Sequence, residues 1–174
     1  LTIEGSFKRF IHLLDKHLTE QPFLMGERPG ASDFAVYGQL TCLALFDPTP
    51  QAIILAACPR VYAWVETVEE LSGYLVSDSD WLDLDNPPET LKNILAEVGR
   101  IYAPYLMGNA KAVMEKADKL EMELDGKPWV QNPFVYQAKC LQWLREAYAA
   151  LQAADRRRVD GVLKGTGVMQ LFEA

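Results

Sequence analysis

Three kinds of side chain in this 174-residue sequence could do chemistry: three cysteines, two histidines and a run of acidic residues. Thiolates are nucleophiles and metal ligands, but Cys42, Cys58 and Cys140 lie far apart, so their spacing predicts neither a zinc site nor a disulfide framework. No histidine is near Cys42 or Cys140 in the sequence to activate a thiol, and we interpret both as small buried hydrophobic residues. The odd number of cysteines in the chain, three, fits a reducing, cytoplasmic compartment.

The histidines and the acidic run do not suggest a metal centre. His12 and His17 are five residues apart, which is the wrong spacing for two ligands on one face of a helix. The acidic stretch lacks the central glycine and the closing glutamate of a calcium loop, although it carries Asp78, Asp80, Asp83 and Asp85. We therefore predict a solvated linker over residues 77–87, and we predict no metal ligand and no catalytic residue in this chain.

Composition excludes two further classes of partner. The net charge of −7 argues against nucleic acid, which requires clustered Lys and Arg, and the one basic run, Arg156 to Arg158, is interpreted as a solvated helix face. No apolar run is long enough to cross a bilayer. A hydrophobic content of 49% can still supply a substantial core, so we expect a folded, soluble protein.

The clearest structural signal is the start of a helix near residue 31. Asp33 follows Gly30 by three positions, so its carboxylate can accept hydrogen bonds from backbone N–H groups at the helix start. Gly30 offers no side-chain acceptor in return, and that half of the capping box is either lost or taken over by Ser32. Apolar residues then recur every three or four positions up to Asp47-Pro48, which ends the helix: Phe34, Tyr37, Leu40, Leu43 or Ala44, and Phe46.

This segment resembles the N-capping box and core helix of the glutathione transferase C-terminal domain. The family's usual form is Ser/Thr-x-x-Asp after Leu-x-Gly-x-x-Pro; Asp33 matches it and Gly30 departs from it. Pro59-Arg60-Val61 with Trp64 resembles the start of the next helix of that domain, and Asp47-Pro48-Thr49-Pro50 resembles a connection found in bacterial members. The fold class predicted is mainly α, a glutathione-transferase C-terminal-like helical bundle with a small β-hairpin near residues 120–131.

The hairpin and the remaining helices are predicted from local patterns. An amphipathic helix precedes Gln21-Pro22, one starting at Pro88 is kinked or restarted by Pro104, and a long one follows Pro133. Alternating residues before Asp125-Gly126 predict the hairpin. We expect Asp155 to cap a short last helix, with the terminal apolar residues packed back on the body. The domains expected are a partial transferase domain (1–76), the linker (77–87) and a helical extension (88–174), packed as one unit; the extension resembles that of some bacterial glutathione-transferase-like proteins.

The resemblance implies a function for the intact protein. In that family a thioredoxin-like domain upstream carries the glutathione site, so this chain is expected to be a C-terminal fragment with no cofactor of its own. The intact protein would conjugate glutathione, its co-substrate, with a small hydrophobic electrophile, and it could be a homodimer. The resemblance implies Tyr37, Leu40 and Phe46 as residues of the electrophile pocket, with a purely structural role in the helix core as the alternative for each.

Two other functions stay open from the sequence. The first is a non-catalytic glutathione-transferase fold used for assembly, as in metaxin-like and translation-factor relatives. The second is a small helical binding module that is complete in itself, against which the start in mid-domain counts. In the extension, Tyr136, Gln137 and Lys139 beside Trp129 could line a ligand cavity, although an ordinary amphipathic helix explains them equally.

Overall fold

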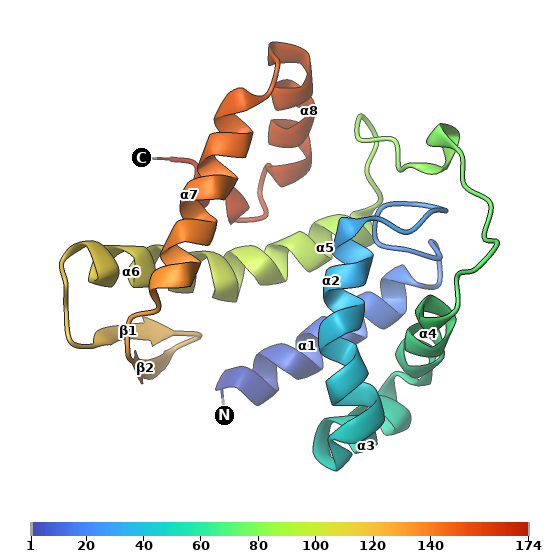
Figure 1. The fold of residues 1–174 in the computed structure, drawn as a ribbon, viewed down its shortest axis with the longest axis horizontal. Coiled ribbons are helices and arrows are strands. Elements are labelled where there is room, and N and C mark those ends of the chain that lie inside the picture. Colours follow the sequence, from blue (N-terminus) through green and yellow to red (C-terminus); the bar gives the residue numbers. More distant parts are fainter. Residues whose placement is uncertain (1, 174) are drawn as a thin grey trace. The chain divides into compact units, whose positions relative to one another are not determined.

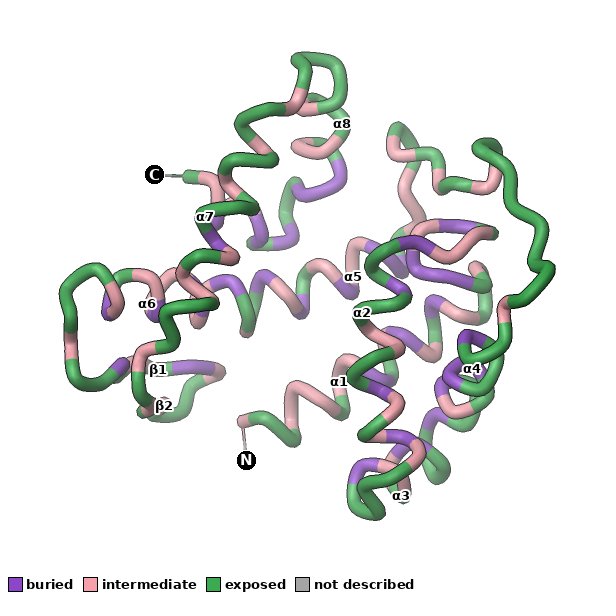
Figure 2. Tube along the Cα trace, in the orientation of Figure 1, coloured by how far each residue is buried: buried purple, intermediate pink, exposed green. Residues whose placement is uncertain are grey.

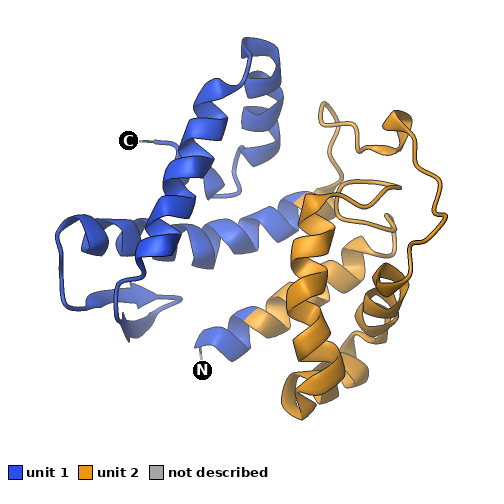
Figure 3. Cartoon of the chain, viewed as in Figure 1, with its two compact units in different colours: residues 1–6, 92–174 blue, residues 7–91 orange. Residues whose placement is uncertain are grey.

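The computed structural model describes residues 2–173, which form a mainly helical chain with one small antiparallel sheet (Figure 1). This confirms the predicted fold class. The chain divides into two compact units. We call residues 7–91 the first unit, which is drawn orange and labelled unit 2 in Figure 3; residues 1–6 with 92–174 are the second unit, drawn blue and labelled unit 1. The boundaries fall inside α1 (Thr2–His17) and near the start of α5 (Glu89–Glu97). The segment 77–87, expected to be a linker, lies inside the first unit, and the domain boundaries drawn from the sequence stay a prediction.

In the unit of residues 7–91, α1 is followed by α2 (Ala31–Leu40), the π-helical turn η1 (Thr41–Phe46), α3 (Pro48–Ala57) and α4 (Pro59–Glu69). The helix predicted from Ala31 to Phe46 is present, with its last turn widened into η1. The helix α3 was not predicted, because Asp47-Pro48 was interpreted only as a stop. The Asp47 side chain accepts a hydrogen bond from the N–H of Thr49 at 3.1 Å, so the residue that ends one helix also caps the next.

The core of this unit is apolar, with one buried histidine at its edge. Its fully or almost fully buried residues come from every helix of the unit and include Ile11, Leu14, Phe23, Leu40, Ala44, Ile54, Val61 and Val65. His17 is also fully buried; its Nε2 donates to the carbonyl oxygen of Phe23 at 3.1 Å, and its Nδ1 lies 3.0 Å from Oγ1 of Thr90. Both ring nitrogens therefore have structural partners.

Three expectations about burial in this unit are wrong. The helical spacing of Phe34 and Phe46 predicts that they share the apolar face that packs on the core, but they are 52% and 76% exposed. Cys42 was expected to be buried and is exposed. The buried face of the helix runs through Asp33, Leu40 and Ala44. Phe34, Cys42 and Phe46 lie away from that face. Of the other cysteines, Cys58 is buried and Cys140 is partly buried.

The acidic segment is held against the loop that precedes α2. The N–H of Glu27 donates to the carbonyl of Asp80 at 2.8 Å, and the N–H of Leu82 donates to the carbonyl of Met25, also at 2.8 Å. Trp81 forms a bridge with Gly26 and stacks under the Arg28 guanidinium, 4.4 Å from the ring centre. Trp81 and Leu82 therefore fix this segment to the loop that precedes α2.

The second unit contains most of α5, the π-helical turn η3 (Val98–Tyr102), α6 (Ala103–Met114), β1 (Leu120–Leu124), β2 (Lys127–Gln131), α7 (Val135–Ala150), α8 (Ala153–Leu163) and the 3₁₀ turn η4 (Val168–Leu171). Pro104 lies in the first turn of α6, where a proline needs no N–H partner, so the restart predicted there is present. Asp155 is in the first turn of α8, whose N-cap is Gln152; the prediction that Asp155 caps this helix is wrong.

The core of this second unit joins α6, α7, α8 and η4. Its buried members are Ala103, Leu106, Leu141, Leu163, Val168 and Leu171. Leu141 is the one buried residue of α7, and Figure 2 shows the remaining turns of that helix as exposed or intermediate. The terminal residues Val168 to Phe172 pack back onto the body, as the sequence predicted.

The hairpin of this unit has the predicted position and turn. Asp125 and Gly126 both have positive φ angles, 55° and 70°, as a two-residue type I′ turn requires. Leu124 pairs with Lys127 and Leu120 with Gln131, so β1 and β2 are antiparallel. Pro128 lies opposite Glu123 in this two-stranded sheet.

Among the described residues, no single helix has the length and hydropathy of a membrane span, although Ala31–Phe46 and Pro48–Ala57, bent by 97° where they meet, pass the criteria as a pair.

Candidate functional site

The start of α2 is organised by the buried carboxylate of Asp33. Its Oδ1 accepts the N–H of Leu24 at 2.7 Å, and its Oδ2 accepts the N–H of Gly30 at 2.9 Å. Asp33 is fully buried, so both donors are satisfied by carboxyl oxygens away from water. One side chain therefore fixes both the start of the helix and the loop that leads into it.

The reciprocal hydrogen bond of a capping box has no side-chain acceptor here. Gly30 is the N-cap residue, in an extended conformation with φ −121° and ψ −178°, and it makes no side-chain bond. Ser32 is exposed, and its hydroxyl has no hydrogen bond with any described residue. Of the two possibilities for this half of the box, the structure shows its loss rather than its replacement by Ser32.

The surroundings of Asp33 shift its pKa in two opposite directions. Burial raises the pKa of the Asp33 carboxyl above its ordinary value, because the carboxylate loses its hydration. The N–H donors of Leu24 and Gly30 and the charge of His17 act in the opposite direction and offset part of that rise in pKa. This is an arrangement for holding a helix in place, and it presents no nucleophile.

The three residues expected in an electrophile pocket have different exposures. Leu40 is 2% exposed and belongs to the core, Tyr37 is half-buried, and Phe46 projects from the end of η1 with 76% of its surface exposed. Tyr37 and Leu40 share a helix, whereas the widened turn η1 stands between them and Phe46. Of the three, only Tyr37 and Phe46 present surface to a ligand.

The open side of α2 and η1 is apolar and contains small residues. Its exposed members are Phe34, Ala35, Gly38, Cys42 and Phe46. Sequence reasoning missed this surface because it assigned the large apolar residues to the core. The signal that could have found it is the buried Asp33: the buried stripe continues from that residue at helical spacing, and Phe34 and Phe46 lie off the stripe.

Of the polar residues suggested for a cavity in the second unit, Gln137 and Trp129 belong to a hydrogen-bond network, and Tyr136 and Lys139 do not. The hydroxyl of Tyr105 donates to Oε1 of Gln137 and accepts from Nε2 of Gln131 at 2.8 Å, and Trp129 donates to Gln131 at 3.1 Å. These bonds join α6, α7 and the hairpin. Tyr136 and Lys139 are exposed, and the Lys139 ammonium lies 4.9 Å from the ring centre of Trp143.

No group of three or more His, Cys, Asp or Glu side chains that could hold a metal ion occurs in residues 2–173.

A helical unit whose second helix begins at a buried aspartate is the arrangement that the sequence motifs suggested. Residues 3–67 match the family model of the glutathione S-transferase C-terminal domain, a span that includes α1 to most of α4 and the Asp33 cap. The match supports a glutathione S-transferase C-terminal domain in this part of the chain. Comparison with curated proteins and with solved structures gave no match.

Proposed function

We propose that this chain is the C-terminal portion of a glutathione S-transferase-like protein and supplies one wall of the pocket for the electrophile. The observation that carries the proposal is the family match over residues 3–67, which includes the capped helix. The exposed apolar side of α2 and η1 supports it, because a small hydrophobic electrophile needs an apolar surface of this kind.

The reaction proposed is thiol conjugation. The glutathione thiolate donates an electron pair to an electrophilic carbon, a sulfur–carbon bond forms, and either a leaving group departs with its electron pair or the carbanion is protonated. The residues of this chain would orient the electrophile: Phe46 and Tyr37 by apolar contact, and Leu40 by supporting Tyr37 from the core. Activation of the thiol is not assigned to any residue of this chain.

The test is a kinetic comparison of two truncations in the protein expressed from its complete gene. Phe46→Ala removes an exposed aromatic ring from the proposed wall, and Leu55→Ala, on α3, removes an apolar side chain that is 49% exposed and outside it. We expect Phe46→Ala to raise KM for 1-chloro-2,4-dinitrobenzene about tenfold, in proportion to the apolar area lost, and to leave KM for glutathione unchanged. Leu55→Ala should change neither.

Two outcomes would overturn this function. If both variants behave alike in the conjugation assay, the α2 and η1 surface is not the pocket wall. If the wild-type protein conjugates no electrophile and binds no glutathione, the alternative remains, a non-catalytic glutathione-transferase fold used for assembly, metaxin-like or translation-factor-like. A cytoplasmic homodimer is part of the same proposal, and sedimentation of the intact protein measures its oligomeric state.

A further inference from the structure

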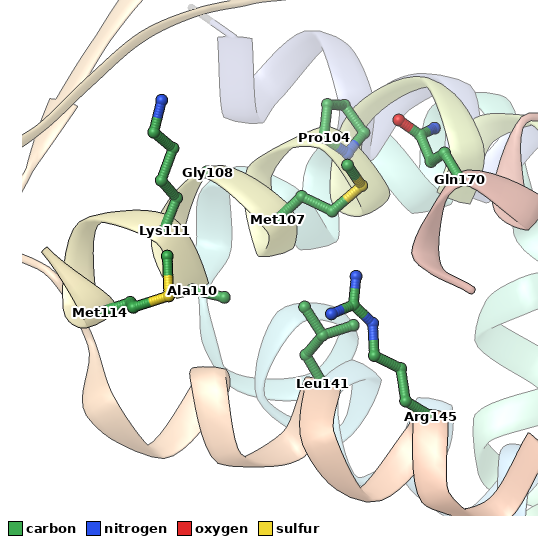
Figure 4. A pocket seen from close by; sticks show the side chains of 9 residues that line it. All are labelled: Pro104, Met107, Gly108, Ala110, Lys111, Met114, Leu141, Arg145 and Gln170. Atoms are coloured by element: carbon green, nitrogen blue, oxygen red, sulfur yellow. The ribbon is translucent and has the colours of Figure 1, made fainter. Parts of the chain in front are cut away.

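A separate pocket lies in the second unit, between α6, α7 and η4. Its volume is about 480 Å³, within the range of small-molecule sites, and Figure 4 shows its lining. Its lining residues come from α6, from α7 (Leu141 and Arg145) and from η4 (Gln170). None of them belongs to the part of the chain that matches the transferase family model.

Most of this lining is apolar and adaptable. Met107 and Met114 contribute unbranched thioether side chains from α6, and Leu141 faces them from α7 (Figure 4). Methionine side chains adjust their shape to the ligand, which suits a flexible or variable apolar group. No carboxylate lines the pocket.

One cation points into this apolar space. Figure 4 shows the Arg145 side chain rising from α7 toward α6 beside Leu141, whereas the ammonium of Lys111 points away from α7. Only the aliphatic stem of Lys111 therefore faces the pocket. Arg145 is the charged group available to a ligand between the two helices.

Arg145 is held in position without being neutralised. Its Nε donates to the carbonyl oxygen of Leu171 at 2.6 Å, which fixes the guanidinium plane against η4. Its two terminal nitrogens make no hydrogen bond or ion pair with any described residue. The two terminal nitrogens of such a guanidinium can donate a pair of hydrogen bonds to the two oxygens of a carboxylate.

The side chain of Gln170, at the same end of the pocket, is fixed by backbone carbonyls and supplies no free donor to a carboxylate. Its Nε2 donates to the carbonyls of Gly99 at 3.0 Å and Gly167 at 2.5 Å, so its amide group is oriented and its Oε1 is left over. The chain carries a net charge of −7, so attraction of an anion depends on the local Arg145 and not on the protein as a whole.

We propose that this pocket binds a small monocarboxylic acid with an apolar body, such as a medium-chain alkyl carboxylate. The carboxylate binds the terminal nitrogens of Arg145, and the apolar body lies against Met107, Met114 and Leu141. This proposal does not rest on glutathione conjugation, because none of the lining residues belongs to the α2 and η1 surface and no step of the binding uses glutathione.

The first test is calorimetric titration of the protein with decanoate, below the concentration at which decanoate forms micelles. Arg145→Gln removes the charge and the paired donors of the guanidinium. Lys111→Gln is the matched control, because it also removes one positive charge, but the Lys111 ammonium points away from the pocket. We expect saturable binding of decanoate that Arg145→Gln weakens about tenfold or more and Lys111→Gln changes by less than about twofold. Equal effects of the two variants, or no saturable binding by the wild type, would overturn the proposal.

Two further probes separate the head group from the chain. Decanol has the same apolar body without a charge, and decyl phosphate has a different anion. The proposal requires decanoate to bind more tightly than either; equal or tighter binding of decanol removes the role of Arg145, and tighter binding of decyl phosphate overturns the carboxylate class.

A filling variant keeps the proposal testable if Arg145→Gln fails to fold. Ala110→Phe places a ring in the pocket from α6, from the side that Figure 4 shows facing α7. With an unchanged circular dichroism spectrum, this variant should lose decanoate binding. Retained binding would show that decanoate binds elsewhere. Because no step uses glutathione, failure here leaves the proposed transferase function untouched.

Discussion

The side chain of Asn109 forms hydrogen bonds with both backbone polar groups of Phe134. Its Nδ2 donates to the Phe134 carbonyl oxygen at 2.9 Å, and its Oδ1 accepts the Phe134 N–H at 2.7 Å. Asn109 is fully buried in α6, and Phe134 is the residue before the first turn of α7. One amide group thus joins the two helices that border the carboxylate pocket.

We expect Asn109→Ala to lower the free energy of unfolding by about 1 to 3 kcal/mol, because it leaves the backbone groups of Phe134 without their partner. Asn109→Asp should be worse than Asn109→Ala, since a carboxylate cannot donate to the Phe134 carbonyl and repels its oxygen. Asn132→Ala, at an exposed site in the same unit, is the control and should change the free energy by at most about 0.5 kcal/mol. Urea denaturation measures all three, and an Asn109→Ala variant as stable as Asn132→Ala would contradict the assigned role.

The second prediction concerns the cap of α2. Asp33→Ala leaves the N–H groups of Leu24 and Gly30 unpaired in a buried site, so we expect a loss of about 2 kcal/mol or more in the free energy of unfolding. Ser32→Ala should leave the melting temperature unchanged, because the Ser32 hydroxyl is exposed and caps nothing. A melting temperature equally lowered by both substitutions would show that Ser32 takes part in the cap.

The pH dependence of stability tests the burial of the same carboxylate. Because the pKa of Asp33 is raised in the folded protein, its proton is held more tightly there than in the unfolded chain. The stability that this proton contributes is fully present below the ordinary pKa of 3.8 and is lost as the pH rises through the raised value.

The measurement is urea denaturation of the wild type and of Asp33→Asn, which does not titrate at this position, at a series of pH values from 3.5 to 7. The free energy of unfolding of the wild type minus that of the variant should decrease with rising pH and then level off. The subtraction removes the titration of the other acidic groups. A difference that stays flat, or increases with pH, would mean that the hydrogen bonds to Asp33 outweigh its desolvation.

The features that the sequence predicted correctly are the ones specified by neighbouring residues. The Asp125-Gly126 turn needs only two residues that adopt positive φ, and the start of α2 needs only Asp33 at the third helical position. The role of Asn109 could not be predicted in this way, because its partner Phe134 is 25 residues away and no local pattern reveals it.

Features that depend on what covers a surface were missed. Phe46 has the spacing of a core residue and is 76% exposed, because the widened turn η1 and the start of α3 redirect the end of the helix. The expected pocket residues Tyr37, Leu40 and Phe46 fall on differently covered parts of one helix for the same reason. Arg145 belongs to no sequence motif. The structure is needed to show that its Nε donates to the carbonyl oxygen of Leu171 while its terminal nitrogens stay available.

The last prediction uses two glycines whose surroundings differ most. Gly99 lies buried in η3, and a Cβ there would sit 2.0 Å from the carbonyl oxygen of Thr166 and 2.8 Å from the carbonyl carbon of Gly167. Both contacts are to backbone, so an alanine must displace the turn between α8 and η4. Gly38, in α2, would place a Cβ in open space.

We therefore expect Gly99→Ala to destabilise the fold by about 3 kcal/mol or more, through overpacking against backbone. Gly38→Ala should instead stabilise it by about 0.5 to 1 kcal/mol, because alanine is the better helix former. Thermal unfolding of the two variants gives opposite shifts if the contact between Gly99 and residues 166–167 is as tight as the structure shows. A Gly99→Ala variant as stable as the wild type would contradict the close contact between Gly99 and residues 166–167.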